Sequence, residues 1–178
     1  METTKNALPD HIKLFFKELS EYLDTKLLYF GSVQRGDYFP GTSDIDVDVF
    51  TDNESSVMAK MQHYLHIKKS KFKKFVWKLN HNNTLAYGHK FMYKNIEPGH
   101  EFSVEFSIYN EKYKKGVLHE HLKKTVLPFY ATWMLIILKV LHYNLYILPE
   151  KQFKYLKKKV LTLAIGLPDD EFVVLDAK

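Results

Sequence analysis

The chain of 178 residues contains no cysteine, and Arg35 is the only arginine among its 26 basic residues. Without cysteine there are no disulfides and no thiolate metal sites, so any metal must be held by oxygen or imidazole ligands. Apolar runs are also short. The most apolar one, residues 131–148, is interrupted by Lys139, His142 and Asn144, which argues against a membrane span. The N-terminus lacks a signal-peptide pattern, and we expect a cytoplasmic protein with no membrane partner.

What is present is enough apolar material for one packed core. Hydrophobic residues make up 46% of the chain and aromatic residues 15%. We therefore predict a single domain over residues 1–178, with a sheet core over 1–110 and a helical section over 111–178. The net charge is +5, which is compatible with nucleotide or nucleic-acid partners but is weak evidence by itself.

The hydrophobic periodicity predicts an α/β (α+β) fold: a mixed, twisted sheet of about five strands, flanked by helices, with a C-terminal helical section. The predicted helices are 9–23, 53–66, 111–124, 128–146 and 149–163, and the predicted strands are 26–30, 44–49, 75–79, 89–94 and 101–109. The apolar run 172–175 is either an added strand or an extended tail. The aromatic and aliphatic stripe from Trp133 to Tyr146 is expected to be core.

Three aspartates alternate with apolar residues along one predicted strand. A period of two places Asp44, Asp46 and Asp48 on one face and the apolar residues between them on the other. Such a row is costly, because like charges repel and burial removes water from them. The row persists most readily around a cation, and hard oxygen ligands select Mg²⁺ or Mn²⁺.

A turn with phosphate-binding groups precedes this strand. Gly31 and Ser32 directly follow a buried strand, and their backbone N–H groups and hydroxyl are ready partners for phosphate oxygens if a helix begins there. Arg35 lies in the same predicted turn and Ser43 directly precedes the aspartates. One loop therefore offers phosphate ligands while the next strand offers metal ligands, as a metal-bound triphosphate requires.

A third carboxylate comes from a later strand. The alternation over residues 101–108 places Glu105 on the polar face, with apolar neighbours on the other. Glu105 beside the aspartate row would complete a site for two metal ions, one at the attacking hydroxyl and one at the leaving pyrophosphate.

These motifs resemble the signature of the DNA polymerase β-type nucleotidyltransferase superfamily, in particular its small stand-alone members. The matching residues are Gly31-Ser32, Arg35-Gly36-Asp37 and Ser43-Asp44-Ile45-Asp46. The resemblance implies that Asp44 and Asp46 bind both metals and that Ser32 and its neighbouring amides hold the terminal phosphates of a nucleoside triphosphate (NTP). It implies transfer of a nucleoside monophosphate to an acceptor hydroxyl of RNA, protein or a small molecule. Glu105 stands where the family more often has aspartate, and Asp48 where an apolar residue is commoner.

Several alternatives stay open at this point. Arg35 could pair with Asp37 or Asp48 instead of a phosphate, and Glu105 could pair with a lysine across its hairpin. The histidines show no convincing ligand spacing, because His119 and His121 would diverge from a helix, so no zinc site is predicted. The rival functions are a non-catalytic nucleotide- or RNA-binding module and a toxin–antitoxin-type interaction protein that retains the fold.

Overall fold

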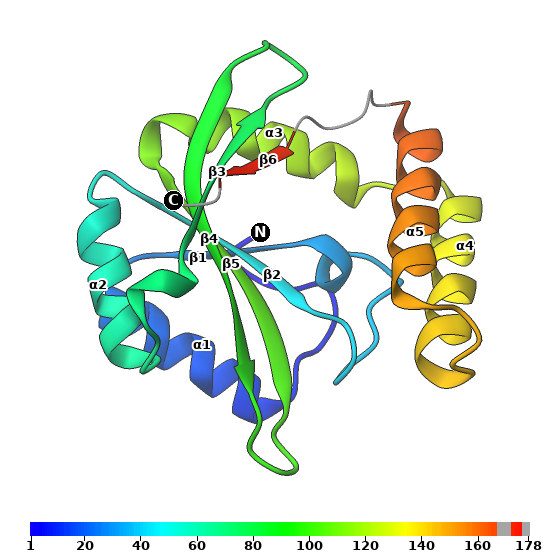
Figure 1. The fold of residues 1–178 in the computed structure, drawn as a ribbon, viewed down its shortest axis with the longest axis horizontal. Helices are drawn as coiled ribbons and strands as arrows, with labels where there is room; N and C mark the ends of the chain where they lie inside the picture. Colours follow the sequence, from blue (N-terminus) through cyan, green and yellow to red (C-terminus); the bar gives the residue numbers. More distant parts are fainter. Residues whose placement is uncertain (167–171, 176–178) are drawn as a thin grey trace.

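The computed structural model describes residues 1–166 and 172–175, and Figure 1 shows their arrangement around one sheet. The helices are α1 (Asp10–Leu23), α2 (Glu54–Tyr64), α3 (Lys114–Thr125), α4 (Phe129–Lys139) and α5 (Glu150–Ile165). The strands are β1 (Leu27–Phe30), β2 (Ile45–Thr51), β3 (Lys73–Lys78), β4 (Leu85–Asn95), β5 (Phe102–Asn110) and β6 (Phe172–Leu175). The predicted mixed α/β fold is confirmed.

The sheet has six strands in the order β1-β2-β5-β4-β3-β6. All neighbours are antiparallel except β2 and β5, which are parallel. The sixth strand exceeds the predicted number because residues 172–175 pair with β3. The backbone groups at this sheet edge thereby find partners, which an extended tail would not provide.

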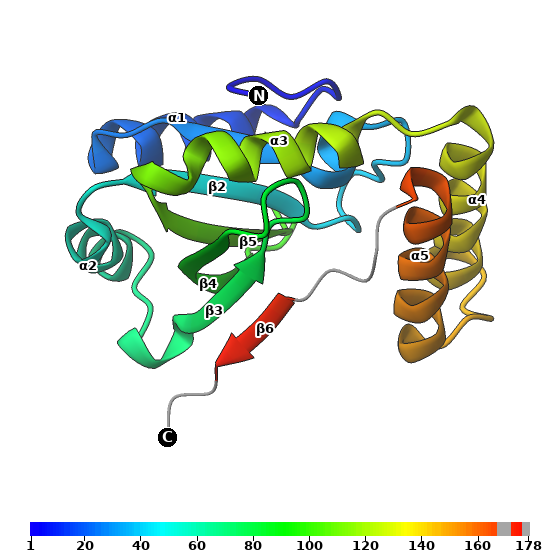
Figure 2. The ribbon, with the colours of Figure 1, turned by 90° about the horizontal axis from the view of Figure 1, so that it is seen from above.

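Helices cover both faces of the sheet, as Figure 2 shows from above. The alternate residues of β2 that point away from the aspartates, Ile45, Val47 and Val49, are buried with α1 and α2 in the larger core. On the opposite face, Val117 of α3 packs with aromatic residues of the sheet, among them Trp77. The two faces of β2 thus differ in chemistry, one wholly apolar and the other acidic.

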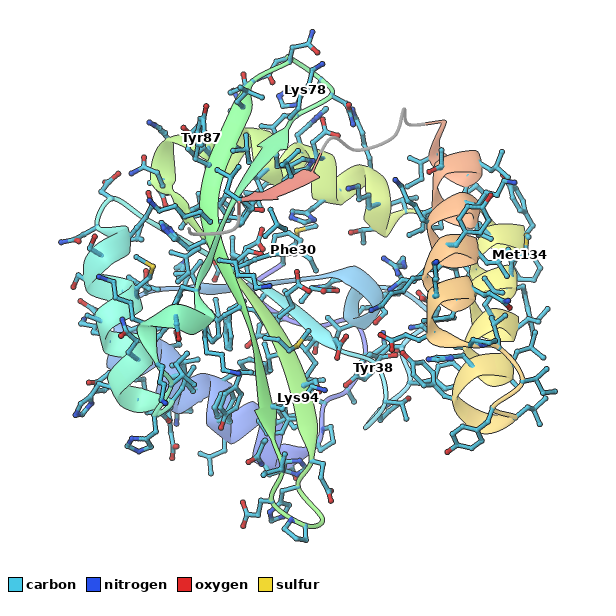
Figure 3. The ribbon with its side chains drawn as sticks, viewed as in Figure 1. Phe30, Tyr38, Lys78, Tyr87, Lys94 and Met134 are labelled. Carbon is cyan, nitrogen blue, oxygen red and sulfur yellow. The ribbon has the colours of Figure 1, made fainter. Side chains whose placement is uncertain are left out.

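Helices α4 and α5 form a pair that stands beside the sheet in both ribbon views (Figures 1 and 2). Their contact buries Ala131, Leu135 and Val160. The prediction that the stripe from Trp133 to Tyr146 is core was wrong, since these two residues are 51% and 84% exposed. Only one side of α4 meets α5, and the other carries apolar side chains outward, such as Met134 in Figure 3.

The predicted helix 128–146 is not one continuous α-helix. Regular helix ends at Lys139, and a π-helical turn follows over Val140–Asn144. In the part of the chain that the structure describes, no single helix is long and apolar enough to cross a membrane. The segments 111–125 and 129–144 meet those criteria only as a pair, and they are bent by 83°.

Candidate active site

Two neighbouring strands bring acidic side chains to the same face of the sheet. In the parallel pairing of β2 with β5, Asp46 lies opposite Glu105, and Asp48 lies opposite Ser107. Side chains that are directly paired in a sheet point to the same face. Asp44 immediately precedes β2 and is exposed. The aspartate row and the carboxylate of the second strand are therefore neighbours in space.

A cavity of about 290 Å³ opens beside these carboxylates. It is lined by Phe30, Gly31, Ser32, Arg35, Asp46, Asp48, Trp77, Glu105, Ser107, Tyr109, His121, Lys124, Lys157 and Leu161. Phe30, the last residue of β1, is labelled near the centre of the molecule in Figure 3. A larger cavity of about 400 Å³, beside α1, contains none of these residues. We place the site in the smaller cavity, where acidic and basic groups from distant segments meet.

The Gly31 turn packs directly against the carboxylate of Asp46. Gly31 has a φ of 65°, and a Cβ added to it would lie 1.6 Å from Oδ2 of Asp46. Only glycine fits, since any other side chain would overlap the carboxylate. The turn that follows is a four-residue 3₁₀ turn, Gly31–Gln34, and not the longer helix that the sequence allowed. Phosphate binding here would therefore depend on individual N–H groups and on the buried Ser32.

Loss of water and the negative charge of Glu105 both raise the pKa values of Asp44 and Asp46. Burial is the main cause that raises the pKa of Asp46 to about 6, and the charge of Glu105 adds to it, while Lys157 and Arg35 oppose the shift. Asp44 is more exposed, and its pKa is also raised, first because the surrounding protein removes part of the water around its carboxyl group, with Lys157 opposing the shift and Glu105 adding to it. Both carboxylates thus sense Glu105 as a nearby like charge. Raised carboxylate pKa values in a cavity are typical of functional clusters.

The family model of the nucleotidyltransferase domain matches residues 10–127, a segment that contains the Gly31 turn and all of these carboxylates. The chain belongs to this family. Membership supports nucleotidyl transfer as the general chemistry of the domain, and the observed mixed sheet is the fold that the sequence resemblance implied.

Comparison with solved structures finds Cid1, a poly(U) polymerase. The chain is 18% identical to it with a TM-score of 0.42, and the same values hold for Cid1 bound to the UTP analogue UMPNPP. A third structure is also of Cid1, described there with RNA terminal uridylyl transferase activity, and the chain is 16% identical to it with a TM-score of 0.41. The matches cover 74% of this chain but only 40–41% of those chains. A comparison with curated proteins finds no match.

Besides lying opposite Asp46, Glu105 forms an ion pair in this nucleotidyltransferase domain. Its Oε1 lies 3.3 Å from Nζ of Lys90 on β4, the cross-hairpin pair that the sequence left open as an alternative. Asp44, Asp46 and Glu105 are not among the described residues whose ligand atoms already gather as a metal-binding group. Three like charges without a cation between them repel, and Lys90 attracts Glu105. The same residue is thus in register with Asp46 and tied to a lysine.

Arg35 and Ser43 belong to a buried network beside the cavity. Nε of Arg35 donates to Oδ1 of Asp37 over 2.8 Å, so the pairing with Asp37 that the sequence left open as an alternative to phosphate binding is present. Nζ of Lys139 on α4 lies 3.2 Å from Oδ2 of the same aspartate and donates to Oγ of Ser43 over 3.0 Å. That hydroxyl also accepts from the N–H of Phe39. Arg35 still lines the cavity, whereas Ser43 holds the loop before β2.

Asp48 is held by a residue that the sequence reasoning missed. It is buried, and Nε2 of His121 on α3 lies 3.0 Å from its Oδ2. The His121 ring stacks on Phe30, with 3.9 Å between ring centroids. Burial raises the pKa of Asp48, and His121 opposes that shift. Asp48, at a place where the family more often has an apolar residue, therefore joins α3 to the sheet at the inner end of the cavity.

Two lysines from the C-terminal half also face the site. Lys157 of α5 lines the cavity and is the strongest cationic influence on both Asp44 and Asp46. Lys124 of α3 lines it too, and its Nζ lies 4.8 Å from the centroid of the Trp77 ring. The lysine density around Lys157 was visible in the sequence, where it left open both a solvated helix face and the steering of a triphosphate or an RNA backbone toward the site. Which lysines reach the site depends on how α3 and α5 pack.

Proposed function

We propose that this domain transfers a nucleoside monophosphate from an NTP to an acceptor hydroxyl and releases pyrophosphate. The acceptor oxygen forms a bond to the α-phosphorus, the bond to the bridging oxygen of pyrophosphate breaks, and the hydroxyl proton is released. The observation that carries the proposal is the pairing of Asp46 with Glu105 in adjacent strands, directly beside the Gly31 turn.

The donor set fits divalent cations. Asp44, Asp46 and Glu105 offer only carboxylate oxygens, which Mg²⁺ and Mn²⁺ prefer, and one or two carboxylates with phosphate oxygens are the usual Mg²⁺ environment. The raised pKa of Asp46 shows a carboxylate whose charge lacks sufficient compensation from the surrounding protein. We propose that these three residues hold two ions. When bound, such ions neutralise the polyphosphate charge and acidify the attacking hydroxyl.

The remaining residues of the cavity bind and orient the substrate. The Gly31 backbone and Ser32 provide N–H and O–H donors for the terminal phosphates. Lys157 adds positive charge where the triphosphate would lie, which lowers the cost of bringing a polyanion next to carboxylates. Arg35 holds the turn through its pairing with Asp37. Catalysis here rests on positioning and electrostatic stabilisation, without a covalent intermediate on the protein.

The decisive experiment is label transfer. Each α-labelled NTP is incubated with the protein, Mg²⁺ or Mn²⁺, and three acceptor pools: RNA, protein extract and small alcohols such as aminoglycosides. We expect one pool to become labelled by wild type and not by an Asp44→Asn/Asp46→Asn variant. Asp52→Asn is the matched control, because Asp52 directly follows the last residue of β2 and is exposed. Equal labelling by wild type and the double variant would refute the proposal.

Binding measurements separate the rival functions. Isothermal titration with each NTP should show binding that requires Mg²⁺ or Mn²⁺ and that the double variant loses. Binding without a metal, and without label transfer, would indicate a non-catalytic nucleotide- or RNA-binding module. The absence of binding to any NTP would indicate an interaction protein that has kept the fold.

A further inference from the structure

A second cluster of ligand-type side chains lies outside the catalytic cavity, where the turn after β3 meets α3. In this turn, the backbone N–H of His81 donates to Oε1 of Glu120 over 3.0 Å, and its Nδ1 lies 2.9 Å from the same oxygen. The ring of His119 is beside that of His81, with 4.6 Å between centroids. Lys78 marks the end of β3 in Figure 3, and Figure 2 shows the turn against α3.

Glu120 is an unusual residue for this position. Its side chain is fully buried, and its Oε2 has no hydrogen-bond partner in the part of the chain that the structure describes. All contacts go to Oε1, which also lies 3.6 Å from Nζ of Lys123 and 3.9 Å from Nδ1 of His119. A buried carboxylate oxygen without a partner costs free energy, and in native proteins such an atom is usually explained by a bound water, an ion or a functional role.

The charge state of Glu120 suits a cation. Burial raises the pKa of Glu120, but the hydrogen bonds from His81, together with the charges of Lys123 and His81, leave the pKa below its ordinary value. Glu120 is therefore a carboxylate at neutral pH. The side chain of Lys123 is 35% exposed, so its ammonium group can turn to water when another cation approaches.

We propose that His81, His119 and Glu120 bind one Zn²⁺ ion, with the fourth position open to solvent. One ligand atom from each residue lies within 4.8 Å of the others. Ligand atoms around a tetrahedral zinc ion are about 3.4 Å apart, given bond lengths near 2.1 Å, so small side-chain rotations close the site. Two imidazoles and one carboxylate favour zinc over Mg²⁺. His119 is half exposed and gives the ion a path of entry.

The position of this site assigns its role. His119 and Glu120 are adjacent to His121, which holds Asp48, and Lys124 on the next turn of α3 lines the catalytic cavity. An ion between His81 and Glu120 would pin the β3–β4 turn to α3 close to these residues. Gly116 allows the close approach, since a Cβ there would lie 2.7 Å from Leu79 and 3.3 Å from His81. The role that we assign to this ion is to hold the turn against α3, at a place separate from the proposed catalytic ions.

Zinc binding to the full chain tests the proposal directly. Protein stripped with a chelator is titrated with Zn²⁺ against a competing fluorescent chelator, and Co²⁺ reports geometry through its visible absorption. We expect one Zn²⁺ ion per chain, a tetrahedral Co²⁺ spectrum, and a melting temperature about 5–10 °C higher at a free zinc concentration of about 100 Kd. His81→Ala/His119→Ala should weaken binding by at least about 100-fold.

Three further variants distinguish loss of this zinc site from a folding defect and from metal binding elsewhere. His63→Ala/His100→Ala removes two exposed histidines outside the cluster and should bind Zn²⁺ like wild type. Asp44→Asn/Asp46→Asn should also keep the tight zinc site, so the result does not depend on the proposed transferase function. His119→Ala alone should also weaken binding, and because His119 is half exposed its removal should not disturb the fold. Wild-type affinity in both variants that lack His119, or loss of zinc only in the aspartate variant, would overturn the proposal.

Discussion

The Asp46 carboxylate occupies the place where a side chain at Gly31 would begin: a Cβ added to residue 31 would lie 1.6 Å from Oδ2 of Asp46. β1 and β2 pair antiparallel, and Phe30 lies opposite Asp46 in this pairing, so the start of the turn meets the carboxylate. The backbone that would cradle phosphates is thereby held directly against the carboxylate that we propose as a metal ligand.

This contact predicts the effect of Gly31→Ala. The methyl group must displace the Asp46 carboxylate, and alanine also opposes a φ of 65°. We expect loss of at least about 100-fold in label transfer, because a displaced ligand about 1 Å out of place costs that much. Gly41→Ala is the matched control: φ is 78° there, and nothing lies within 4 Å of the added Cβ.

In Gly41→Ala, only the strain of a non-glycine residue at positive φ should remain. It should lower the free energy of unfolding by about 1 kcal/mol, or the melting temperature by about 2–4 °C. Thermal unfolding and label transfer are measured on both variants. Equal activity losses in the two would mean that φ strain, and not the contact with Asp46, explains the requirement for glycine.

The two roles of Glu105 can be separated by its partners. If Glu105 is a metal ligand, Glu105→Gln should lower label transfer by at least about 100-fold, while Lys90→Met, which removes the ion-pair partner at 3.3 Å, should leave transfer within about threefold. If the pair with Lys90 is what matters, both variants should lose activity alike. The measurement is kcat with saturating Mg²⁺ and NTP.

Asp46 should make the metal-free protein less stable as pH rises. Its folded pKa of about 6 lies above the ordinary value of 3.8, so the folded state binds more protons than the unfolded state between these two values. The free energy of unfolding therefore falls across about pH 4 to 6, by roughly 2 kcal/mol from this group. Asp46→Asn should lack that decrease.

Thermal unfolding in chelator between pH 4.5 and 7.5 checks this sign. The melting temperature of Asp46→Asn relative to wild type should rise with pH and level off above about pH 7, at a gain of about 5 °C. A constant difference across the range would show that burial does not raise the pKa of Asp46. Added Mg²⁺ should reduce the gain, because a cation relieves the same repulsion in wild type.

Lys157 should contribute to NTP affinity through its charge. Lys157→Met removes the strongest cationic influence on Asp44 and Asp46, and we expect NTP binding to weaken about 10-fold in low salt, corresponding to about 1.4 kcal/mol. The loss should shrink as salt is added, because salt screens charge. Lys151→Met, an exposed lysine of the same helix, is the control. A salt-independent loss would point to packing.

Some parts of the candidate site could be predicted from the sequence, and others could not. The alternation over residues 44–49 and 101–108 determines which side chains are polar-facing, because a strand turns each successive residue to the opposite face. The Gly31-Ser32 turn before the aspartates was equally visible. The register that sets Glu105 against Asp46 was not, since a shift of two residues between β2 and β5 would keep every side chain on the same face of the sheet.

By itself, the sequence determined the family, the order of most helices and strands, and the residues that we propose bind metal and phosphate, because these follow from short periodic patterns and adjacent motifs. The tertiary structure alone decided which residues meet across long separations: His121 with Asp48, Lys157 with the aspartates, and His81 with Glu120. It also left the outer side of α4 exposed where an apolar helix pattern predicted core. Hydrophobicity records that a side chain prefers burial, whereas the packing of whole helices determines whether a partner surface covers it.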